Sequence, residues 1–231
     1  MQGIGLALDW VSWLIDAMPR RLPIYLLLDT SGSMSGTPIN SVNQGIKTLS
    51  DALMTDPRAA ETAFVSVITF DSNATVAVPL TSAVTFTAPT LTAQAGTELG
   101  KGLKLLEERI NKELVTNSDS AHKGDWKPLI FIMTDGQPTD DNWRAAADSL
   151  KSKKYNIIGC AAGEQADEQV LKEITDTVVK LSDTDSKTMQ AFFKWVTESA
   201  KTMSTSVGTG AAQAGVTLPP PNPNSGIVLV P

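Results

Sequence analysis

The sequence predicts a doubly wound α/β fold, with a mostly parallel central sheet, one antiparallel edge strand and helices on both faces. Short, continuously apolar runs, of the kind found in strands buried on both faces, alternate with segments whose apolar residues repeat at helical spacing. Polar loops separate these segments and end the apolar runs sharply. Consecutive strand, helix and strand elements form right-handed crossovers, which places the strands side by side in a parallel sheet.

The expected strands and helices follow one another between residues 24 and 203. The apolar runs that predict strands are Ile24–Leu28, Ala63–Phe70, Ala74–Leu80, Leu129–Met133, Ile157–Ala162 and Val178–Leu181. The stripes that predict helices are Ile39–Leu53, Leu99–Leu114, Trp143–Leu150, Glu168–Ile174 and Met189–Met203, the last capped by Asp185 or Ser186. The second and third runs are separated only by Asp71-Ser72-Asn73, which predicts an antiparallel hairpin.

The chain is expected to hold one domain with two flanking segments. Residues 1–21 form an N-terminal extension in which Ile4, Leu8, Val11 and Ile15 make a helical stripe. A docked amphipathic helix is the favoured interpretation; a non-native start and an interfacial membrane helix are the alternatives. Residues 22–206 form the domain. Residues 207–231 are a Gly/Pro-rich tail, of which Ile227–Val230 could add a short β-segment to a sheet edge.

Composition excludes several classes of function. The net charge is −6 and no basic block occurs, so nucleic acid is not an expected partner. No run approaches the roughly 20 apolar residues of a membrane-spanning helix. Cys160 is the only cysteine, which rules out an internal disulfide and a cysteine-based zinc site. It is expected to be a buried strand residue, and a reducing, cytoplasmic location fits best.

Two aspartates indicate a metal site. Asp29 and Asp135 each follow a buried apolar run at its carboxyl end, so neighbouring strands would bring their like charges close enough to need a cation. Ser31, Ser33 and Thr97 add hydroxyl groups nearby. Oxygen ligands with few carboxylates suit a hard ion that keeps several waters, so Mg²⁺ is expected, with Mn²⁺ or Ca²⁺ as alternatives.

These residues carry a family resemblance. Asp29-Thr30-Ser31-Gly32-Ser33 resembles the Asp-x-Ser-x-Ser motif of von Willebrand A (VWA) and integrin I domains. Gly96-Thr97 is similar to their threonine loop, and Thr134-Asp135-Gly136 to their second aspartate loop. The parts occur in the family's order and cover roughly Leu22 to Met203. The resemblance implies a Rossmann-like VWA fold with a metal-ion-dependent adhesion site (MIDAS).

By that resemblance, the hydroxyls of Ser31 and Ser33 would bind the metal directly, and Thr97 directly or through water. Asp29 and Asp135 would act mainly through water. One octahedral position would remain open for a glutamate or aspartate of a partner protein. The resemblance therefore implies a Mg²⁺-dependent protein-binding module and not an enzyme.

Two longer segments and the Pro-rich end resemble one particular type of VWA protein. Leu22–Met34 and Phe131–Asp140 look like segments of TerY-type proteins from bacterial tellurite-resistance and stress-response gene clusters, and Leu218–Pro223 resembles their Pro-rich end. The genes in such clusters lie beside a protein kinase and a PP2C-like phosphatase, which become candidate partners. Proteins of this type begin near the equivalent of Met18, so residues 1–17 lie outside the match.

Other functions fit these residues less well. A Mg²⁺-dependent aspartyl-phosphate enzyme that uses Asp29 as phosphoryl acceptor remains as an alternative, although it would want a second aspartate at Ser31 or an acidic pair on a preceding strand. Gly96–Gly102 lacks the spacing of a phosphate loop, and His122, the sole histidine, has no nucleophile motif to serve. A scaffold with a purely structural metal remains as an alternative, although a closed site would draw more of its ligands from the protein.

Overall fold

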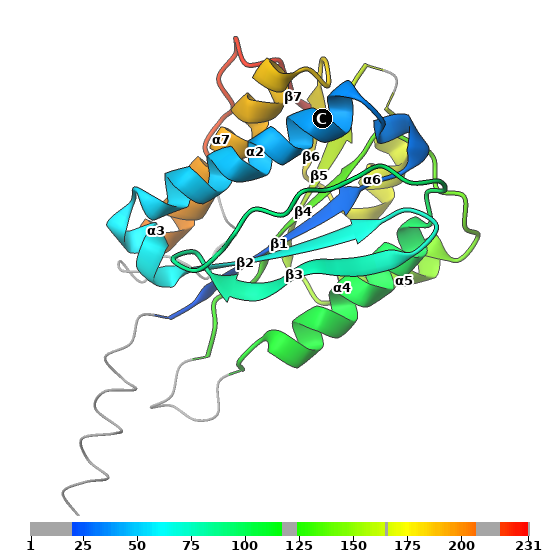
Figure 1. Ribbon diagram of the computed structural model, residues 1–231. Helices are drawn as coiled ribbons and strands as arrows, with labels where there is room; N and C mark the ends of the chain where they lie inside the picture. The colour runs from blue at the N-terminus through cyan, green and yellow to red at the C-terminus, as the bar shows by residue number, and fades with distance from the viewer. Residues whose placement is uncertain (1–19, 117–123, 165, 207–217, 231) are drawn as a thin grey trace, which may run out of the picture.

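The computed structural model of the chain describes residues 20–116, 124–164, 166–206 and 218–230 (Figure 1). The amphipathic helix expected in the N-terminal extension, the loop residue His122 and residues 207–217 and 231 of the Gly/Pro-rich tail lie outside these residues. None of the described helices is long and apolar enough to cross a membrane.

A sheet in the order β3-β2-β1-β4-β5-β6-β7 runs through the centre of the described domain. Its strands are β1 (Leu22–Asp29), β2 (Ala63–Phe70), β3 (Ala74–Ser82), β4 (Leu129–Thr134), β5 (Asn156–Ala162), β6 (Val178–Leu181) and β7 (Ile227–Val230). Strands β2, β1, β4, β5 and β6 are parallel to one another, whereas β3 pairs with β2 and β7 with β6 in the antiparallel sense. The sheet is mostly parallel as predicted. It has an antiparallel strand at each edge, because the end of the tail pairs with β6.

Helices cover both faces of the sheet, as predicted (Figure 1). One face carries α2 (Thr37–Met54), α3 (Pro57–Thr62) and α7 (Ser186–Ser206), which pack against one another. The other carries α4 (Leu99–Glu113), α5 (Trp143–Ser152) and α6 (Glu168–Ile174). Helix α3 was not predicted, since its six residues bury only Ala59 and therefore leave no apolar stripe in the sequence. At the start of α7 the backbone N–H of Thr188 donates to Oδ1 of Asp185 at 2.7 Å, which confirms the expected cap.

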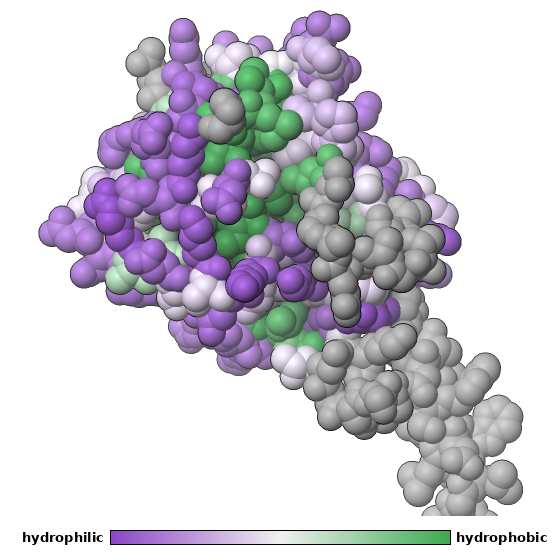
Figure 2. Space-filling model, turned by 180° about the vertical axis from the view of Figure 1, so that it is seen from behind, coloured by the Kyte–Doolittle hydropathy of each residue, from purple (hydrophilic) through white to green (hydrophobic). Residues whose placement is uncertain are grey.

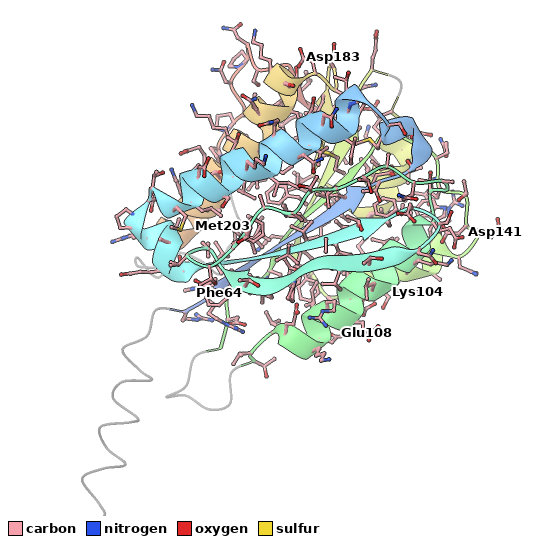
Figure 3. All side chains as sticks on the ribbon, viewed as in Figure 1. Phe64, Lys104, Glu108, Asp141, Asp183 and Met203 are labelled. Atoms are coloured by element: carbon pink, nitrogen blue, oxygen red, sulfur yellow. The ribbon has the colours of Figure 1, made fainter. Side chains whose placement is uncertain are left out.

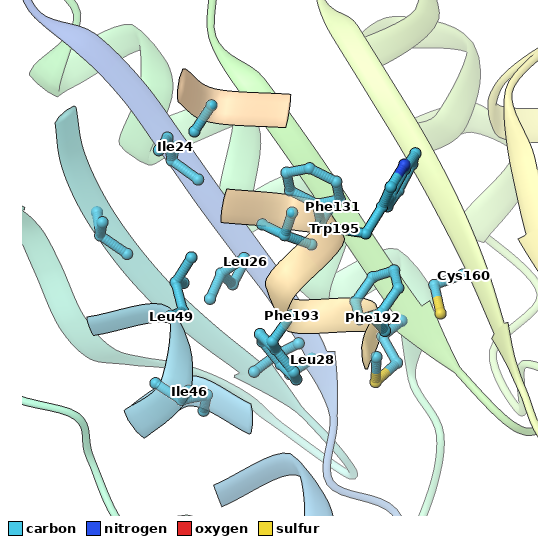
Figure 4. Packing of buried hydrophobic residues seen from close by; sticks show 14 of the residues in the cluster. Ile24, Leu26, Leu28, Ile46, Leu49, Phe131, Cys160, Phe192, Phe193 and Trp195 are labelled. Carbon is cyan, nitrogen blue, oxygen red and sulfur yellow. The ribbon is translucent and has the colours of Figure 1, made fainter. Parts of the chain in front are cut away.

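Each face of the sheet has its own hydrophobic core, which explains why the strands read as continuous apolar runs. Successive side chains of β1 alternate between the two cores, with Leu26 facing α2 and α7 and Leu27 facing α4. In the first core the rings of Phe131 and Phe192 meet edge to face at 6.2 Å (Figure 4). Cys160 lies in the same core as expected, and burial raises the pKa of its thiol.

An apolar band crosses the far face of the molecule, in the region where Figure 1 places β7 (Figure 2). The side chains of Val228 and Leu229 in this strand are 60% and 48% exposed. Strand β7 therefore forms an edge of the described sheet and carries exposed apolar side chains.

The strand order reverses at β1, since the chain passes from β1 to β2 on one side and later returns to place β4 on the other. In doubly wound sheets, ligands bind beyond the carboxyl ends of the strands at such a reversal. Asp29 is the last residue of β1, and Asp135 follows the last residue of β4. The fold therefore brings the two predicted aspartates to the ligand-binding end of the sheet.

Candidate metal centre

Asp29 is the buried anchor of the site. Its side chain has no solvent exposure. One carboxylate oxygen, Oδ1, accepts a hydrogen bond from the backbone N–H of Ser31 at 2.7 Å, and Oδ2 accepts one from Oγ1 of Thr134 at 2.5 Å. Burial raises the pKa of this carboxyl above its usual range, the hydrogen bonds from Ser31 and Thr134 oppose that shift, and the charge of Asp135 adds to it. In the metal-free protein, ionisation of Asp29 is therefore unfavourable.

The two serines connect the aspartates. Oγ of Ser33 donates to Oδ1 of Asp135 at 2.8 Å and lies 3.0 Å from Oγ of Ser31. A 3-10 turn over Gly32–Met34 holds both hydroxyls on the same side, with the backbone N–H of Met34 donating to the carbonyl of Ser31 at 3.0 Å. Burial also raises the pKa of Asp135, and the hydrogen bond from Ser33 opposes it. The hydroxyls and carboxylates therefore form one continuous group of oxygens.

Thr97 reaches this group from the loop before α4. A Cβ atom built on Gly136 would lie 4.0 Å from both Oγ of Ser33 and Oγ1 of Thr97, so both hydroxyls lie near the backbone that follows Asp135. Thr97 is 9% exposed. The structure therefore brings together all of the residues that the sequence singled out, which are Asp29, Ser31, Ser33, Thr97 and Asp135.

The chemistry of these residues fits a hard divalent cation. Among the described residues, neither Asp29 nor Asp135 forms an ion pair with Lys or Arg. Two partly or fully buried carboxylates without a counter-ion raise each other's cost of ionisation, and a bound cation would remove that cost. The other donors are hydroxyl oxygens, and no group of three His, Cys, Asp or Glu gathers in the described chain. Such a donor set suits Mg²⁺ better than zinc.

Sequence reasoning missed residues that support the site from behind. The Thr134 hydroxyl bonds to Asp29, although only its place beside Asp135 in the motif pointed to it. The backbone N–H of Thr30 donates to the carbonyl of Phe70 at 2.9 Å, and its hydroxyl lies 3.1 Å from Oδ2 of Asp71. These contacts fix the loop after β1 against the end of β2.

The fold and this geometry agree with the comparisons to known proteins. The family model of the von Willebrand factor type A domain matches residues 24–200. The chain belongs to the von Willebrand factor type A domain family. An uncharacterized protein of Synechocystis sp. (strain ATCC 27184 / PCC 6803 / Kazusa) is 33% identical to this VWA chain over 129 residues. The match covers 53% of this chain and 27% of that protein, so the chain spans about a quarter of its relative's length.

Solved VWA structures share the fold at low sequence identity. A von Willebrand factor type A protein from Catenulispora acidiphila has a TM-score of 0.61 at 20% identity, covering 80% of this chain and 43% of its own. The pilus adhesin SpaC of Lactobacillus rhamnosus GG has a TM-score of 0.64 at 16% identity, covering 79% and 31%. Proximal thread matrix protein 1 of the mussel byssus, with a zinc-occupied MIDAS motif, has a TM-score of 0.56 at 18% identity, covering 78% and 48%. At these identities the likeness concerns the fold.

Proposed function

We propose that this VWA domain is a Mg²⁺-dependent protein-binding module whose MIDAS consists of Asp29, Ser31, Ser33, Thr97 and Asp135. The observation that carries the proposal is the convergence of three hydroxyls and two carboxylates at the strand-order reversal, where no described Lys or Arg pairs with either carboxylate. VWA domains commonly mediate metal-dependent protein interactions, and the mussel VWA protein has a structure with its MIDAS motif occupied by zinc. Mn²⁺ or Ca²⁺ would be alternative ions at the same oxygens.

The proposed roles follow from the position of each side chain. Ser31 and Ser33 would bind the ion directly, since their hydroxyls lie 3.0 Å apart, with Ser33 exposed and Ser31 buried beside it. Thr97 would bind directly or through water, and Asp29 and Asp135 would act mainly through water. A Mg²⁺ ion bound by hydroxyls and water keeps positive charge and one position open, which a Glu or Asp of a partner can fill.

The charges around the site support dependence on the ion. The described loops at the carboxyl ends of the parallel strands contain no Lys or Arg. Besides the two site aspartates, they carry Asp71, Asp140, Asp141, Glu164, Asp167, Asp183 and Asp185. Glu98, in the linker before α4, is paired with Lys101 at 2.8 Å. Figure 3 shows Asp141 and Asp183 at this end of the molecule. Without a bound cation, the negative potential of these loops would repel an acidic partner residue. Affinity for such a residue should therefore disappear completely when the metal is removed.

The candidate partners are a protein kinase and a PP2C-like phosphatase, in a bacterial tellurite-resistance or stress-response system in the cytoplasm. The support for this part is the resemblance of Leu22–Met34 and Phe131–Asp140 to TerY-type proteins. An aspartyl-phosphate enzyme is disfavoured, because Asp29 is fully buried and both of its oxygens already accept hydrogen bonds. We therefore propose binding and not catalysis.

The proposal can be tested by binding the two candidate partners to immobilised domain in Mg²⁺ and in EDTA. The wild type and the Ser152→Ala control, which changes an exposed serine on α5, should retain a partner in Mg²⁺ only. The Ser31→Ala/Ser33→Ala double variant should retain none. Equal binding by the double variant would refute the adhesion site. Stabilisation by Mg²⁺ in thermal melts, without Mg²⁺-dependent binding of any acidic partner, would favour the structural scaffold.

A further inference from the structure

Thr97 differs from the other site residues in how it is held. Asp29 and Asp135 stand at strand ends, and the serines follow directly on β1, but Thr97 lies at the end of a long linker that follows β3. On one side this linker is fixed to the β2–β3 turn, where the N–H of Ser72 donates to the carbonyl of Ala95 at 2.8 Å. The backbone N–H of Glu98 also donates to the carbonyl of Asp71 in that turn, at 2.8 Å. A separate set of contacts joins Thr97 to the loop that carries Asp135.

Those contacts come from Thr139. The backbone N–H of Thr97 donates to Oγ1 of Thr139 at 3.2 Å, and the backbone N–H of Thr139 donates to the carbonyl of Thr97 at 2.9 Å. One residue thus binds both backbone polar groups of Thr97. Thr139 lies in the same loop as Asp135, four positions further along the chain. The pair therefore joins the two loops that carry separate site residues.

A neighbouring contact strengthens the same junction. Oδ2 of Asp140 accepts a hydrogen bond from the backbone N–H of Gly100 at 2.9 Å, in the first turn of α4. Thr139 is nevertheless exposed, and its side chain is not part of either hydrophobic core. Loss of its hydroxyl would therefore leave both hydrophobic cores intact, because residues that contribute to packing are normally buried.

We propose that Thr139 is a positioning residue of the metal site, which holds the Thr97 hydroxyl at its place relative to Asp135 and Ser33. The inference rests on the proposed metal-dependent function. Groups that orient metal ligands without touching the metal commonly change affinity by 10–100-fold when they are removed. Removal of the Thr139 hydroxyl breaks one of the two hydrogen bonds that join Thr139 to the Thr97 backbone, so the expected loss of affinity lies at the lower end of that range.

The test uses Thr139→Val, which keeps the branched shape and removes the hydroxyl, and Thr139→Ser, which keeps the hydroxyl. Thr55→Val serves as the matched control, since Thr55 is exposed at the end of α2 and bonds locally to the carbonyl of Ala52. Mn²⁺ binding is followed by the loss of the free-ion signal in electron paramagnetic resonance. We expect about tenfold weaker Mn²⁺ binding for Thr139→Val. Thr139→Ser and Thr55→Val should bind as the wild type does.

Amide hydrogen exchange of the metal-free protein separates positioning from general damage. In Thr139→Val the Thr97 amide should exchange faster, while the melting temperature without metal stays that of the Thr55→Val control. Unchanged Mn²⁺ affinity in Thr139→Val overturns the inference, whether or not the Thr97 amide exchanges faster. Equal weakening in Thr139→Ser, or a lowered metal-free melting temperature, overturns it in favour of a structural role. Absence of Mn²⁺ binding in the wild type overturns the proposed metal site as well.

Discussion

The buried carboxylates at the two ends of the parallel strands have different neighbours. At the amino end, the side chain of Asp125 is 4% exposed and accepts hydrogen bonds from Nε and Nη2 of Arg21 at 2.7 and 2.5 Å. The N–H of Val115 adds a third bond at 2.8 Å. At the carboxyl end, Asp29 is fully buried and accepts bonds from the neutral groups of Ser31 and Thr134. Asp125 has a counter-ion within the chain, whereas Asp29 has none among the described residues.

The difference separates Asp125, whose charge is compensated within the fold, from Asp29, whose charge a bound cation would compensate. A buried charge that is paired and hydrogen-bonded stabilises its surroundings against loss of the partner. A buried charge without a counter-ion lowers the stability of the protein alone, and such groups concentrate at functional sites. Substitutions at the amino end should therefore change the free energy of unfolding but not the affinity for metal. Substitutions at the carboxyl end should change the response to metal.

The largest change in stability is expected from Asp125→Asn. The substitution leaves Arg21 without its bidentate partner, and we expect a loss of about 3 kcal/mol, the low end for a buried pair because the Arg21 side chain is 30% exposed. Urea unfolding of the metal-free protein measures it. Asp176→Asn is the matched control. The Asp176 side chain is 97% exposed and its ion pair with Lys151 is long, at 3.7 Å, so this substitution should change stability by less than about 1 kcal/mol. A simultaneous loss of Mn²⁺ affinity in Asp125→Asn would contradict the separation of the two ends.

An Asp-to-Asn substitution at the carboxyl end of the strands should change the response to metal without destabilising the metal-free protein. Asp29→Asn removes a buried charge and keeps an oxygen for the N–H of Ser31, so the metal-free protein should be as stable as the wild type or more so. Mg²⁺ at 100 times its dissociation constant should stabilise the wild type by about 2.7 kcal/mol and Asp29→Asn not at all. Thermal melts in Mg²⁺ and EDTA measure both effects. The exposed Asp141→Asn control should keep the Mg²⁺ response; retention of that response by Asp29→Asn would refute its role.

A smaller effect is expected where α4 begins. A methyl group on Gly100 would overlap Oδ2 of Asp140 and approach the backbone Cα of Trp143 to 2.9 Å. Asp140 can rotate away, but the backbone of α5 cannot, so Gly100→Ala should destabilise the protein by about 2 kcal/mol and weaken Mn²⁺ binding. Lys104→Ala on the exposed side of the same helix is the control (Figure 3). Helix propensity alone predicts stabilisation by Ala, so a rise in stability would show that the junction is not tight.

The sequence allowed prediction of the strands and helices that have a periodic pattern of apolar residues. The runs Glu168–Ile174 and Val178–Leu181 agree with α6 and β6 to the residue, and β1 extends the predicted Ile24–Leu28 by short additions at each end. The site residues could be predicted for a related reason. Each aspartate closes an apolar strand, and strand ends in a parallel sheet meet at one edge.

Contacts between loops could not be predicted in this way. The pair of Arg21 and Asp125 joins positions 104 residues apart, and the pair of Thr97 and Thr139 joins positions 42 apart. Neither pair has a periodicity or a motif, because loop conformation and not repeating geometry brings the groups together. The sequence indicated that Ile227–Val230 could join a sheet edge, which β7 confirms, but its antiparallel pairing with β6 depends on where the tail returns to the sheet. The sequence therefore indicated the proposed metal ligands, and the structure added residues that contact them.

The smallest predicted effect concerns a neutral partner in the amino-end network. The hydroxyl of Tyr25 is buried and donates to Oε2 of Glu113 at 3.1 Å, and Glu113 also pairs with Arg109. Burial, followed by the charge of Glu113, raises the pKa of Tyr25, which keeps the hydroxyl protonated as a donor. Tyr25→Phe should cost about 1 kcal/mol in urea unfolding, because Arg109 still compensates the carboxylate.

Tyr155→Phe provides the comparison for this last variant. Tyr155 is half-buried against the same core, and its hydroxyl makes no hydrogen bond to the described residues, so its substitution should leave stability unchanged. Mn²⁺ affinity should be the same in both tyrosine variants and in the wild type, since the charges at the amino end are compensated within the chain. A loss of metal affinity in Tyr25→Phe would show that β1 transmits changes from the Glu113 network to Asp29, and the two ends would then have to be treated as one coupled unit.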